Sequence, residues 1–194
     1  MINKTGSQPD ILSPSDAKNI LFKRAKLIQI IREYFRYENV LEVQTPLLSS
    51  YPVTDPQLEN IRVENPKCNY SFNSKEWLFL TTSPEYEMKK LLTLGSGSIY
   101  QICKAFRQDT PGPKHQIEFS ILEWYRVGYD INELINDVFE LLSRCIGINQ
   151  IKKMSYREAF LEYLDFDPCE ISTTDLEEYS KRLIDVSFES KDKN

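Results

Sequence analysis

Residues 98–127 read SIYQICKAFRQDTPGPKHQIEFSILEWYRV, and this segment determines the architecture expected for the chain. β-Branched and aromatic residues, which favour strands, are concentrated in Ser98–Arg107 and again in Glu118–Val127. The connection Gln108–Gln116 is polar and contains proline and glycine, which favour turns and loops. The segment therefore predicts an antiparallel hairpin of two long strands, joined by an unusually long and stiff connection.

Shorter strands are expected before this hairpin. Alternating apolar residues and turn residues predict them at Val40–Gln44, Ile61–Val63, Asn69–Phe72 and Trp77–Leu80. Pro46 cannot donate to a strand ladder, so the first strand should stop at Thr45 and lead into a long loop over Leu47–Gln57. The succession of short strands and turns resembles a meander, which indicates antiparallel pairing.

Helices are expected on both sides of these strands. Apolar residues at helical spacing predict an amphipathic helix over Ser15–Glu38, capped by Ser15 or Asp16. Helices after the hairpin are predicted at Ile131–Cys145, which Gly147 ends, from the capping box Ser155–Glu158, and from Thr173 or Thr174 to Leu183. Helices that flank an antiparallel sheet make this an α+β chain.

A further helix start is indicated by Ser83-Pro84-Glu85. Ser83 suits the N-cap, Pro84 the first helical position, and Glu85 the positive end of the helix dipole. Gly95 and Gly97 should end this helix, since glycine readily adopts the left-handed conformation of a C-terminal cap.

The composition is that of a folded protein without general affinity for nucleic acids. Of the 194 residues, 41% are hydrophobic, which is enough to bury a sizeable core. The 24 Lys and Arg residues are outnumbered by 29 Asp and Glu residues, so the formal charge is -5. A general nucleic-acid binder would carry net positive charge or a basic stripe. A local basic site for one phosphorylated ligand remains compatible with this charge.

We expect a flexible polar leader over residues 1–14 and one domain over residues 15–194. The leader lacks the apolar segment of a signal peptide, and no window approaches the ~20 apolar residues of a membrane span. Cys68, Cys103, Cys145 and Cys169 form no CxxC pair, and His115 is the single histidine, which argues against a zinc site. These features indicate a cytoplasmic protein with reduced thiols.

The connection between the two long strands carries residues suited to bind a nucleotide. Arg107 lies at the end of one strand, Phe119 near the start of the other, and Lys114 and His115 between them. Arginine offers a planar, permanently charged set of donors for phosphate oxygens, and phenylalanine offers a face on which a ring can stack. The hairpin is therefore suited to clamp a flat ring and a polyphosphate together.

Several motifs resemble those of class II aminoacyl-tRNA synthetases. Val43-Gln-Thr-Pro46 resembles motif 1 of that class, and Phe106-Arg-Gln-Asp109 together with His115–Phe119 resembles motif 2. Thr82–Leu92 and Glu118–Arg126 are similar to the lysine-type subgroup, above all to its tRNA-independent relatives, the elongation factor P lysine ligases. The resemblance implies a class II synthetase-like antiparallel sheet flanked by helices and truncated at its C-terminus.

The resemblance also implies roles for individual residues. Arg107 would neutralise charge on the ATP α-phosphate, Phe119 would stack on the adenine, and Asp109 would lie near its amino group. Glu85 would pair with a substrate ammonium. The other implied contacts are Gln108, His115 and Gln116 for ATP, and Ser83, Pro84 and Tyr125 for the amino acid. The implied reaction is attack of a lysine-type carboxylate on the α-phosphate, which releases pyrophosphate and leaves an acyl-adenylate.

The chain departs from the family pattern in three ways. Asp109 replaces the usual glutamate and Gln116 replaces an asparagine, although both keep the functional group. Nothing resembles motif 3, a glycine-rich strand and helix that ends in Glu-Arg. The ligands of Mg²⁺ and the acidic residues that hold the substrate side chain are expected from that region. We therefore expect this chain to be the N-terminal portion of an enzyme.

Partners and alternative functions follow from the same resemblance. It implies ATP and Mg²⁺ as cofactors, lysine or (R)-β-lysine and elongation factor P as substrates, and a homodimer through the motif 1 element. The choice between α- and β-lysine stays open. No anticodon-binding domain is expected before the first helix, so tRNA is not an expected partner. The alternatives are a catalytic fragment of a lysyl-tRNA synthetase that charges tRNA, and an inactive, truncated nucleotide-binding paralogue.

Purely structural roles are the alternatives for some of these residues. Glu85 suits the first turn of a helix through its charge alone. His115 is equally compatible with an ordinary loop residue. Trp124 and Tyr125 point to opposite faces of one strand, so one of them should belong to the core, and the resemblance selects Tyr125 for the site.

Overall fold

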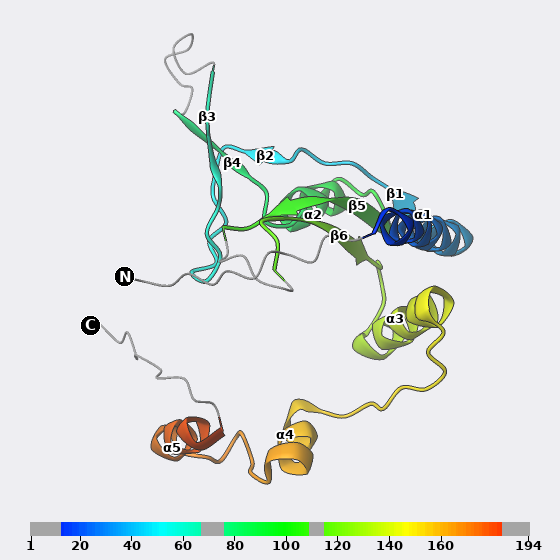
Figure 1. Cartoon of the computed structure of the whole chain (residues 1–194). Coiled ribbons are helices and arrows are strands. Elements are labelled where there is room, and N and C mark those ends of the chain that lie inside the picture. Colours follow the sequence, from blue (N-terminus) through cyan, green and yellow to red (C-terminus); the bar gives the residue numbers. More distant parts are fainter. Residues whose placement is uncertain (1–12, 67–75, 109–114, 184–194) are drawn as a thin grey trace. The chain divides into compact units, whose positions relative to one another are not determined.

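The computed structural model describes residues 13–66, 76–108 and 115–183. The chain divides into two compact units, Met1–Ile148 and Asn149–Asn194 (Figure 1). The extent of one catalytic domain over residues 15–194 stays a prediction, and no boundary near residue 148 was expected. The predicted strand Asn69–Phe72, together with Cys68, Asp109 and Lys114, lies outside the described residues.

The first unit combines helices with two small sheets. Its elements are α1 (Pro14–Tyr37), β1 (Leu41–Glu42), β2 (Leu48–Ser49), β3 (Arg62–Glu64), β4 (Trp77–Leu80), α2 (Glu85–Thr93), β5 (Ile99–Phe106), β6 (Glu118–Tyr125) and α3 (Ile131–Ile146). Among the described residues, one sheet has the strand order β1-β5-β6 and the other β2-β4-β3. The prediction of an α+β fold is confirmed.

Strands β5 and β6 form the long antiparallel hairpin predicted from residues 98–127. Their register pairs Ile99 with Tyr125 at the open end, and Phe106 with Glu118 beside the connection. The ladder continues beyond the strands, because the Arg107 amide donates to the Ile117 carbonyl at 3.0 Å. Side chains alternate along a strand, so the odd-numbered residues of both strands share one face, the front, and the even-numbered residues share the back.

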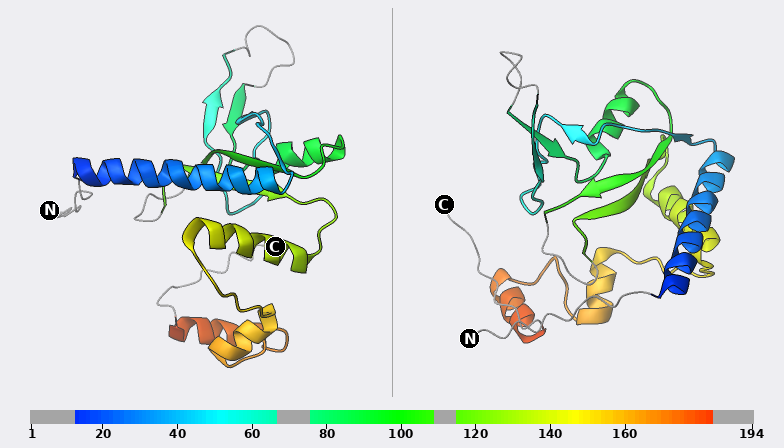
Figure 2. Two further views of the ribbon diagram at one scale, coloured as in Figure 1. Left: turned by 90° about the vertical axis from the view of Figure 1, so that its right-hand side faces the viewer. Right: turned by 45° about the horizontal axis from the view of Figure 1, so that its top comes forward.

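The back face packs on α1 and α3 and forms the core of the first unit. The buried residues of this core are Tyr34, Phe35, Val40, Tyr100 and Leu141, with Ile31, Ile102, Leu122, Trp124 and Cys145 packed against them. The Phe35 ring stacks on Tyr100 with 4.3 Å between centroids, and its centroid lies 5.7 Å from that of Trp124. Full burial of such a side chain contributes about 1.5–3 kcal/mol. Figure 2 shows α1 and α3 lying side by side. Trp124 is thus the core member of the Trp124–Tyr125 pair.

Two of the short strands differ from the predictions. β1 runs parallel to β5, with Leu41 beside Ile99, although an antiparallel sheet was expected. β2 lies inside the segment predicted as a loop and pairs antiparallel with β4. Both pairings join segments far apart in sequence, so no local pattern indicates them. β3 and β4 pair antiparallel, as a meander implies, but they pair directly with each other, whereas the prediction placed the strand Asn69–Phe72 between them.

Two helices begin at serines that precede the predicted caps. Ser13 is the N-cap of α1, where its Oγ accepts from the Asp16 amide at 3.2 Å, and Pro14 occupies the first helical position. The Ser172 Oγ accepts from the Asp175 amide at 3.1 Å before α5 (Thr173–Leu183). The predicted caps, Ser15 or Asp16 and Thr173 or Thr174, already lie inside these helices. In both cases the serine is followed three residues later by an aspartate, the spacing that lets the hydroxyl reach a free backbone amide.

Helix α2 begins one residue later than predicted. Pro84, not Ser83, is the N-cap residue, and its carbonyl accepts from the Met88 amide at 2.9 Å. The Thr81 hydroxyl donates to the Ser83 carbonyl, which holds Ser83 in the turn before the helix. Glu85 keeps its predicted place in the first turn.

Three further helix ends agree with the predictions. The predicted capping box of Ser155 and Glu158 opens α4 (Tyr156–Leu164), and a second capping box, of Asp130 and Glu133, which was not predicted, opens α3. Gly147 caps α3 in the left-handed conformation with a φ of 73°, which glycine adopts without strain. Gly95 and Gly97 follow α2 with positive φ angles of 82° and 75°.

The second unit holds α4 and α5 together through a row of aromatic side chains. Tyr156, Phe160, Phe166 and Tyr179 follow one another with centroid separations of 4.4, 5.3 and 4.8 Å. The Tyr179 hydroxyl donates to the Leu164 carbonyl at 2.7 Å, which ties α5 to the end of α4. Aromatic contacts of this geometry contribute about 0.5–1.5 kcal/mol each beyond the area they bury.

Two findings concern the environment of the protein. None of the helices in the described part of the chain is long and apolar enough to span a bilayer. The thiols of Cys103, Cys145 and Cys169 are free. Burial raises the pKa of both Cys103 and Cys145, so these thiols are weak nucleophiles.

Candidate active site

The front face of the hairpin carries the predicted nucleotide and amino-acid residues at opposite ends. Arg107 and Phe119 lie beside the connection, whereas Tyr125 lies at the open end. Phe119 and Tyr125 are separated by six positions of extended chain, a span of about 20 Å. The two halves of the predicted site are therefore distinct in space and lie on the same hairpin.

Arg107 and Phe119 are in contact. The Arg107 guanidinium lies over the Phe119 ring, 5.1 Å from its centroid, and both side chains are half-buried. The Arg107 Nε also donates to the carbonyl of the buried Thr82 at 3.4 Å, a long and weak hydrogen bond. The structure thus brings together the cation and the aromatic ring that the sequence analysis selected for a nucleotide.

The open end of the front face is acidic. The Tyr125 hydroxyl donates to the Glu123 carboxylate at 2.8 Å. Burial raises the pKa of Glu123, and the negative charge of Glu85 raises it further, while the bond from Tyr125 opposes both. Burial and the neighbouring Glu123 also raise the pKa of Tyr125, which keeps the phenol neutral. A cation bound at this end would be attracted by the carboxylates of Glu123 and Glu85.

Glu85 contributes to this acidic end from the first turn of α2. Its carboxylate pairs with Lys89 on the same helix at 2.5 Å and is half exposed. Its charge nevertheless acts on Glu123 and Tyr125, so the start of α2 lies near the open end of the hairpin. This geometry is compatible with both roles considered for Glu85. The residue can stabilise the helix through its charge in the first turn, and it can also contribute to the site, as the resemblance implies.

Ser83 and Pro84 lie just before α2, next to a small pocket. Pro84 is buried, and the Ser83 Oγ is 3.4 Å from the Glu85 amide. The pocket is lined by Pro46, Ser49, Tyr51, Pro52, Val53, Asn60, Leu80, Thr81, Thr82, Ser83, Tyr86 and Glu87. It joins the end of the motif 1 segment to the start of α2.

The remaining predicted ATP residues lie at the two ends of the connection. Gln108, His115 and Gln116 are exposed. The Gln108 amide donates to the Glu59 carbonyl at 3.1 Å, which fixes the exit of β5. Asp109, predicted near the adenine amino group, lies outside the described residues.

Glu123 and Gln101 on the front face were not predicted from the sequence. Gln101 pairs with Glu123 across the hairpin, is 1% exposed, and accepts from the Thr45 hydroxyl at 3.0 Å. This bond ties the motif 1 segment to the middle of the site. Both residues have the same odd parity as Phe119 and Tyr125, so alternation along the strands was the signal that could have identified them.

The described residues do not supply a metal site. Within residues 13–66, 76–108 and 115–183, no group of three or more His, Cys, Asp or Glu residues is arranged to hold an ion. The acidic pair of Glu85 and Glu123 is spread over two elements, and Glu85 is already bound to Lys89. This part of the chain therefore does not by itself fit the Mg²⁺ that the resemblance implies.

The family model for tRNA synthetases class II (D, K and N) matches residues 10–190. The chain is also similar in structure to asparaginyl-tRNA synthetase from Pyrococcus horikoshii, with a TM-score of 0.58 over 77% of this chain and 30% of that one. At 18% identity, this likeness concerns the fold alone.

Curated relatives are much more similar in sequence. An "Elongation factor P--(R)-beta-lysine ligase" of Avibacterium paragallinarum is 42% identical over 182 residues, covering 93% of this chain and 56% of the relative. The protein of that name from Mannheimia succiniciproducens is 44% identical over 155 residues, covering 80% of this chain and 47% of the relative. The chain thus spans about half the length of the curated relatives it matches.

Proposed function

This chain belongs to the class II tRNA synthetases of the D, K and N group, and on that premise we propose that its protein activates a lysine-type amino acid with ATP and transfers it to a lysine of elongation factor P. Relatives that are 42% and 44% identical and carry the name of an elongation factor P ligase support this choice within the family. Because the chain covers about half of their length, activity, substrates and partners are proposals for the protein that carries this sequence.

One observation carries the proposal: a cation on an aromatic ring and a carboxylate bound by a tyrosine lie at opposite ends of one face of the hairpin. Arg107 over Phe119 suits a nucleotide, and Glu123 with Tyr125 suits an ammonium. A substrate with both groups would lie along the front face, with its reacting atoms between the two ends. ATP joined to a lysine-type amino acid has this distribution of charge.

At the nucleotide end, we assign Arg107 to the α-phosphate and Phe119 to the adenine. The contact between these two side chains is worth about 0.5–1 kcal/mol at a partly exposed position. A charge-assisted hydrogen bond to phosphate is worth about 1.5–3 kcal/mol, so ATP can displace Arg107 from the ring at a net gain. Gln108, Asp109, His115 and Gln116 are proposed as further ATP contacts from the two ends of the connection.

At the amino-acid end, we assign Glu123 and Glu85 to the substrate ammonium and Tyr125 to its orientation. An ammonium beside Glu123 would relieve the cost that burial imposes on that carboxylate. Ser83 and Pro84 are proposed to line the same end.

The proposed reaction has two steps. A carboxylate oxygen of the amino acid attacks the α-phosphorus of ATP, the bond to the pyrophosphate oxygen breaks, and pyrophosphate leaves. The amine of the acceptor lysine then attacks the acyl carbon, AMP leaves with the bonding electron pair, and the amide nitrogen loses a proton. Arg107 would stabilise the charge that develops on the α-phosphoryl oxygens, an electrostatic effect of about 3 kcal/mol.

The partners and the location follow from this activity. Elongation factor P is the proposed acceptor, and a chain of net charge -5 is suited to a partner with a basic surface. We infer a cytoplasmic location, because a translation factor is the proposed substrate. Mg²⁺ is proposed to accompany the ATP phosphates.

We propose that α1 and the motif 1 segment that follows it form a homodimer interface. Ile20, Leu21 and Phe22 on α1 are 49%, 67% and 65% exposed. Exposed apolar groups on one helix are typical of a surface that another protein covers. Analytical ultracentrifugation should find a dimer that Leu21→Glu and Phe22→Glu convert to a monomer; a monomeric wild-type protein would contradict this proposal.

Pyrophosphate exchange in the full-length gene product tests the proposed activity. We expect exchange that depends on lysine or (R)-β-lysine, and a loss of about a hundredfold in Arg107→Ala. Arg24→Ala is the matched control, because Arg24 binds Ser120 on the back of the same hairpin at 2.8 Å. No exchange with either amino acid, or full activity of Arg107→Ala, would contradict the proposal.

A second assay separates the proposed acceptor from tRNA. The family model includes lysine-type tRNA synthetases, which favours tRNA charging as the second candidate function. Incubation with elongation factor P should add one amino-acid mass to one lysine, as measured by mass spectrometry. Charging of tRNA instead would select the synthetase, and ATP binding without exchange would select an inactive paralogue.

A further inference from the structure

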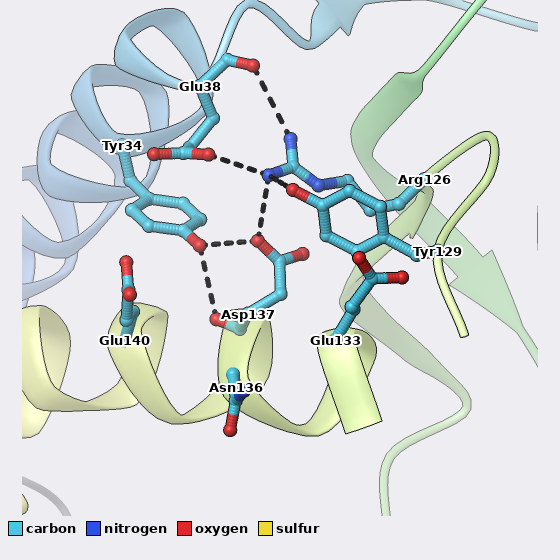
Figure 3. Close-up of a pocket in the computed structure, with 8 residues that line it drawn as sticks. All are labelled: Tyr34, Glu38, Arg126, Tyr129, Glu133, Asn136, Asp137 and Glu140. Carbon is cyan, nitrogen blue, oxygen red and sulfur yellow. Dashed lines mark hydrogen bonds and ion pairs between the residues drawn. The ribbon is translucent and has the colours of Figure 1, made fainter. Parts of the chain in front are cut away.

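A buried polar cluster lies behind the hairpin, where α1, α3 and the end of β6 meet (Figure 3). It consists of Tyr34 from α1, Glu38 at the C-cap of α1, Trp124 and Arg126 at the end of β6, and Asp137 from α3. The Arg126 side chain is 4% exposed and that of Asp137 is 2% exposed. We call this group the Arg126 cluster.

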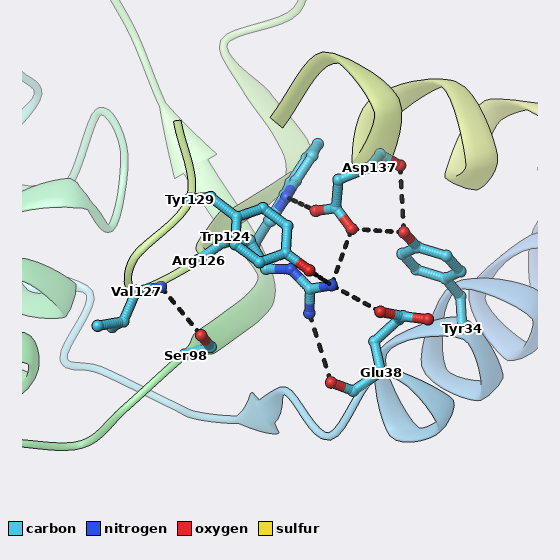
Figure 4. A network of polar contacts seen from close by, with 8 residues as sticks. All are labelled: Tyr34, Glu38, Ser98, Trp124, Arg126, Val127, Tyr129 and Asp137. Carbon is cyan, nitrogen blue, oxygen red and sulfur yellow. Dashed lines mark hydrogen bonds and ion pairs between the residues drawn. The ribbon is translucent and has the colours of Figure 1, made fainter. Parts of the chain in front are cut away.

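Asp137 is the common acceptor of the Arg126 cluster. One of its carboxylate oxygens accepts from the Tyr34 hydroxyl at 2.5 Å and lies 3.1 Å from Arg126 Nη2. The other oxygen accepts from the Trp124 indole nitrogen at 2.9 Å. Figure 4 shows the three donors approaching this one carboxylate from α1 and from both ends of the Trp124–Arg126 segment.

Arg126 completes the cluster on the side of α1. Its Nη2 donates to the Glu38 carboxylate at 2.7 Å and to the Tyr129 hydroxyl at 2.8 Å. Burial lowers the pKa of Arg126, but the bond to Glu38 and the charge of Asp137 outweigh it, so the pKa lies above its usual value. Burial also raises the pKa of Tyr34, which keeps its hydroxyl a donor to Asp137.

The cluster holds both neighbours of Tyr125 in sequence. Trp124 and Arg126 point to the back face and end on Asp137, so the intervening Tyr125 must point to the front. The Val127 amide donates to the Ser98 hydroxyl at 3.0 Å, which fixes the chain directly after this segment. β6 is the outer strand of the described sheet and pairs there with β5 alone. The bonds of the cluster therefore add restraint to a strand that is held by a partner strand on one side.

We infer that Asp137 is a positioning residue for the amino-acid end of the site, an inference that rests on the proposed function. Ion pairs buried to this degree contribute little net stability compared with apolar residues of similar size. An apolar residue at position 137 could not accept hydrogen bonds from Trp124 and Arg126 together. It therefore could not fix the direction in which Tyr125 points. A displacement of about 1 Å in a substrate-binding group can cost up to about a hundredfold in rate, so this restraint matters for catalysis.

The test is the pair of substrate KM values in the full-length gene product, measured by pyrophosphate exchange. Asp137→Asn keeps the size of the side chain but cannot accept from all three donors. We expect it to raise the KM for the amino acid about tenfold and to change the KM for ATP less than twofold. Tyr34→Phe removes one bond to Asp137 and should raise the amino-acid KM about threefold.

Tyr100→Phe is the matched control. Tyr100 lies in the same core, and its hydroxyl donates to the Glu42 carboxylate at 2.9 Å, outside the Arg126 cluster. Its removal should leave both KM values unchanged. A purely structural role of Asp137 predicts instead that both KM values, or neither, change in Asp137→Asn, with any change following the loss of melting temperature.

The outcomes separate this inference from the proposed function. Wild-type exchange with an unchanged amino-acid KM in folded Asp137→Asn would overturn the inference alone. Absence of wild-type exchange with lysine and (R)-β-lysine would overturn the proposed function and the inference with it. If Asp137→Asn does not fold, the amino-acid KM of Tyr34→Phe tests the inference. If this KM equals that of Tyr100→Phe, the inference is overturned.

Discussion

Replacement of Arg126 by methionine should destabilise the first unit by about 3–5 kcal/mol, the usual cost of removing one partner of a buried ion pair. The substitution leaves Asp137, 2% exposed, and Glu38, 24% exposed, facing each other without a counter-ion. Most of the cost should come from Asp137, because water can still reach part of Glu38. Methionine keeps much of the volume of arginine, so loss of packing is a minor part of the effect.

Urea unfolding followed by tryptophan fluorescence measures this loss, since Trp124 lies in the cluster. For a protein of this size, the expected change corresponds to a fall in melting temperature of about 6–20 °C. The double variant Arg126→Met with Asp137→Asn should recover part of the loss, because it removes the more buried of the two unpaired charges.

Arg32→Met is the matched control for this experiment. Arg32 pairs with Glu42 at 2.9 Å, but its side chain is 54% exposed, and such surface pairs are worth about 0–1 kcal/mol. A loss below about 1 kcal/mol in Arg126→Met would refute the reasoning that burial makes the cluster costly to break. A double variant no more stable than the single one would refute the assignment of that cost to Asp137.

Three further predictions concern the site and the fold. Tyr125→Phe should raise the KM for the amino acid and leave that for ATP unchanged in pyrophosphate exchange, because its hydroxyl lies at the acidic end alone; equal changes in both would contradict this division. Glu123→Gln should raise the same KM but increase the melting temperature at neutral pH. Burial raises the pKa of Glu123, so the stability that its protonated form provides is present below the unfolded pKa and is lost as pH rises through the folded one. The higher melting temperature of Glu123→Gln should therefore disappear below the usual pKa of a glutamate; a difference in melting temperature that stays constant across pH would exclude this explanation. Gly147→Ala should lower the stability by about 1 kcal/mol in urea unfolding, because alanine is strained at a φ of 73° although its methyl group would meet no atom within 4 Å; a neutral result would remove the role of this glycine as a helix cap.

Local patterns predicted the elements whose structure depends on nearby residues. The β5–β6 hairpin follows from two runs of strand-forming residues, and α3 from the helical spacing of apolar residues up to Gly147. The start of α4 was predicted from the spacing of Ser155 and Glu158, which bond to each other's backbone. In all three cases the contacts that define the element lie within a few residues or in adjacent strands.

Contacts between distant segments could not be predicted in this way. The parallel pairing of β1 and the short strand β2 depend on partners far along the chain. The N-caps of α1 and α5 were missed for a smaller reason, because several serines, threonines and aspartates adjoin each start and sequence alone does not rank them.

The candidate site was predicted in part. Arg107 and Phe119 were predicted as a pair and are in contact, whereas Glu123 was not predicted, because its role depends on the bond from Tyr125 and on burial in the folded chain. Asp137 was also overlooked, although it lies three residues after Leu134 and four before Leu141, a spacing that places it on the apolar side of α3. A charged residue at such a position is buried only when it has partners, and those partners are brought to it by tertiary structure.

The parallel ladder between β1 and β5 has a consequence for how the protein acquires its structure. It joins positions 41 and 99, with β2, β3, β4 and α2 in between, whereas the hairpin and α3 are contiguous in sequence. Closing so long a loop loses chain entropy before any contact compensates for it, so residues 99–146 should become ordered first and α1 should dock last. During synthesis on the ribosome, however, α1 emerges before the hairpin. At a synthesis rate of about 5–20 residues per second, several seconds pass before the hairpin is available to α1. During that interval the apolar side of α1 is uncovered, and it is the segment of the nascent chain for which we expect the greatest need of chaperone protection.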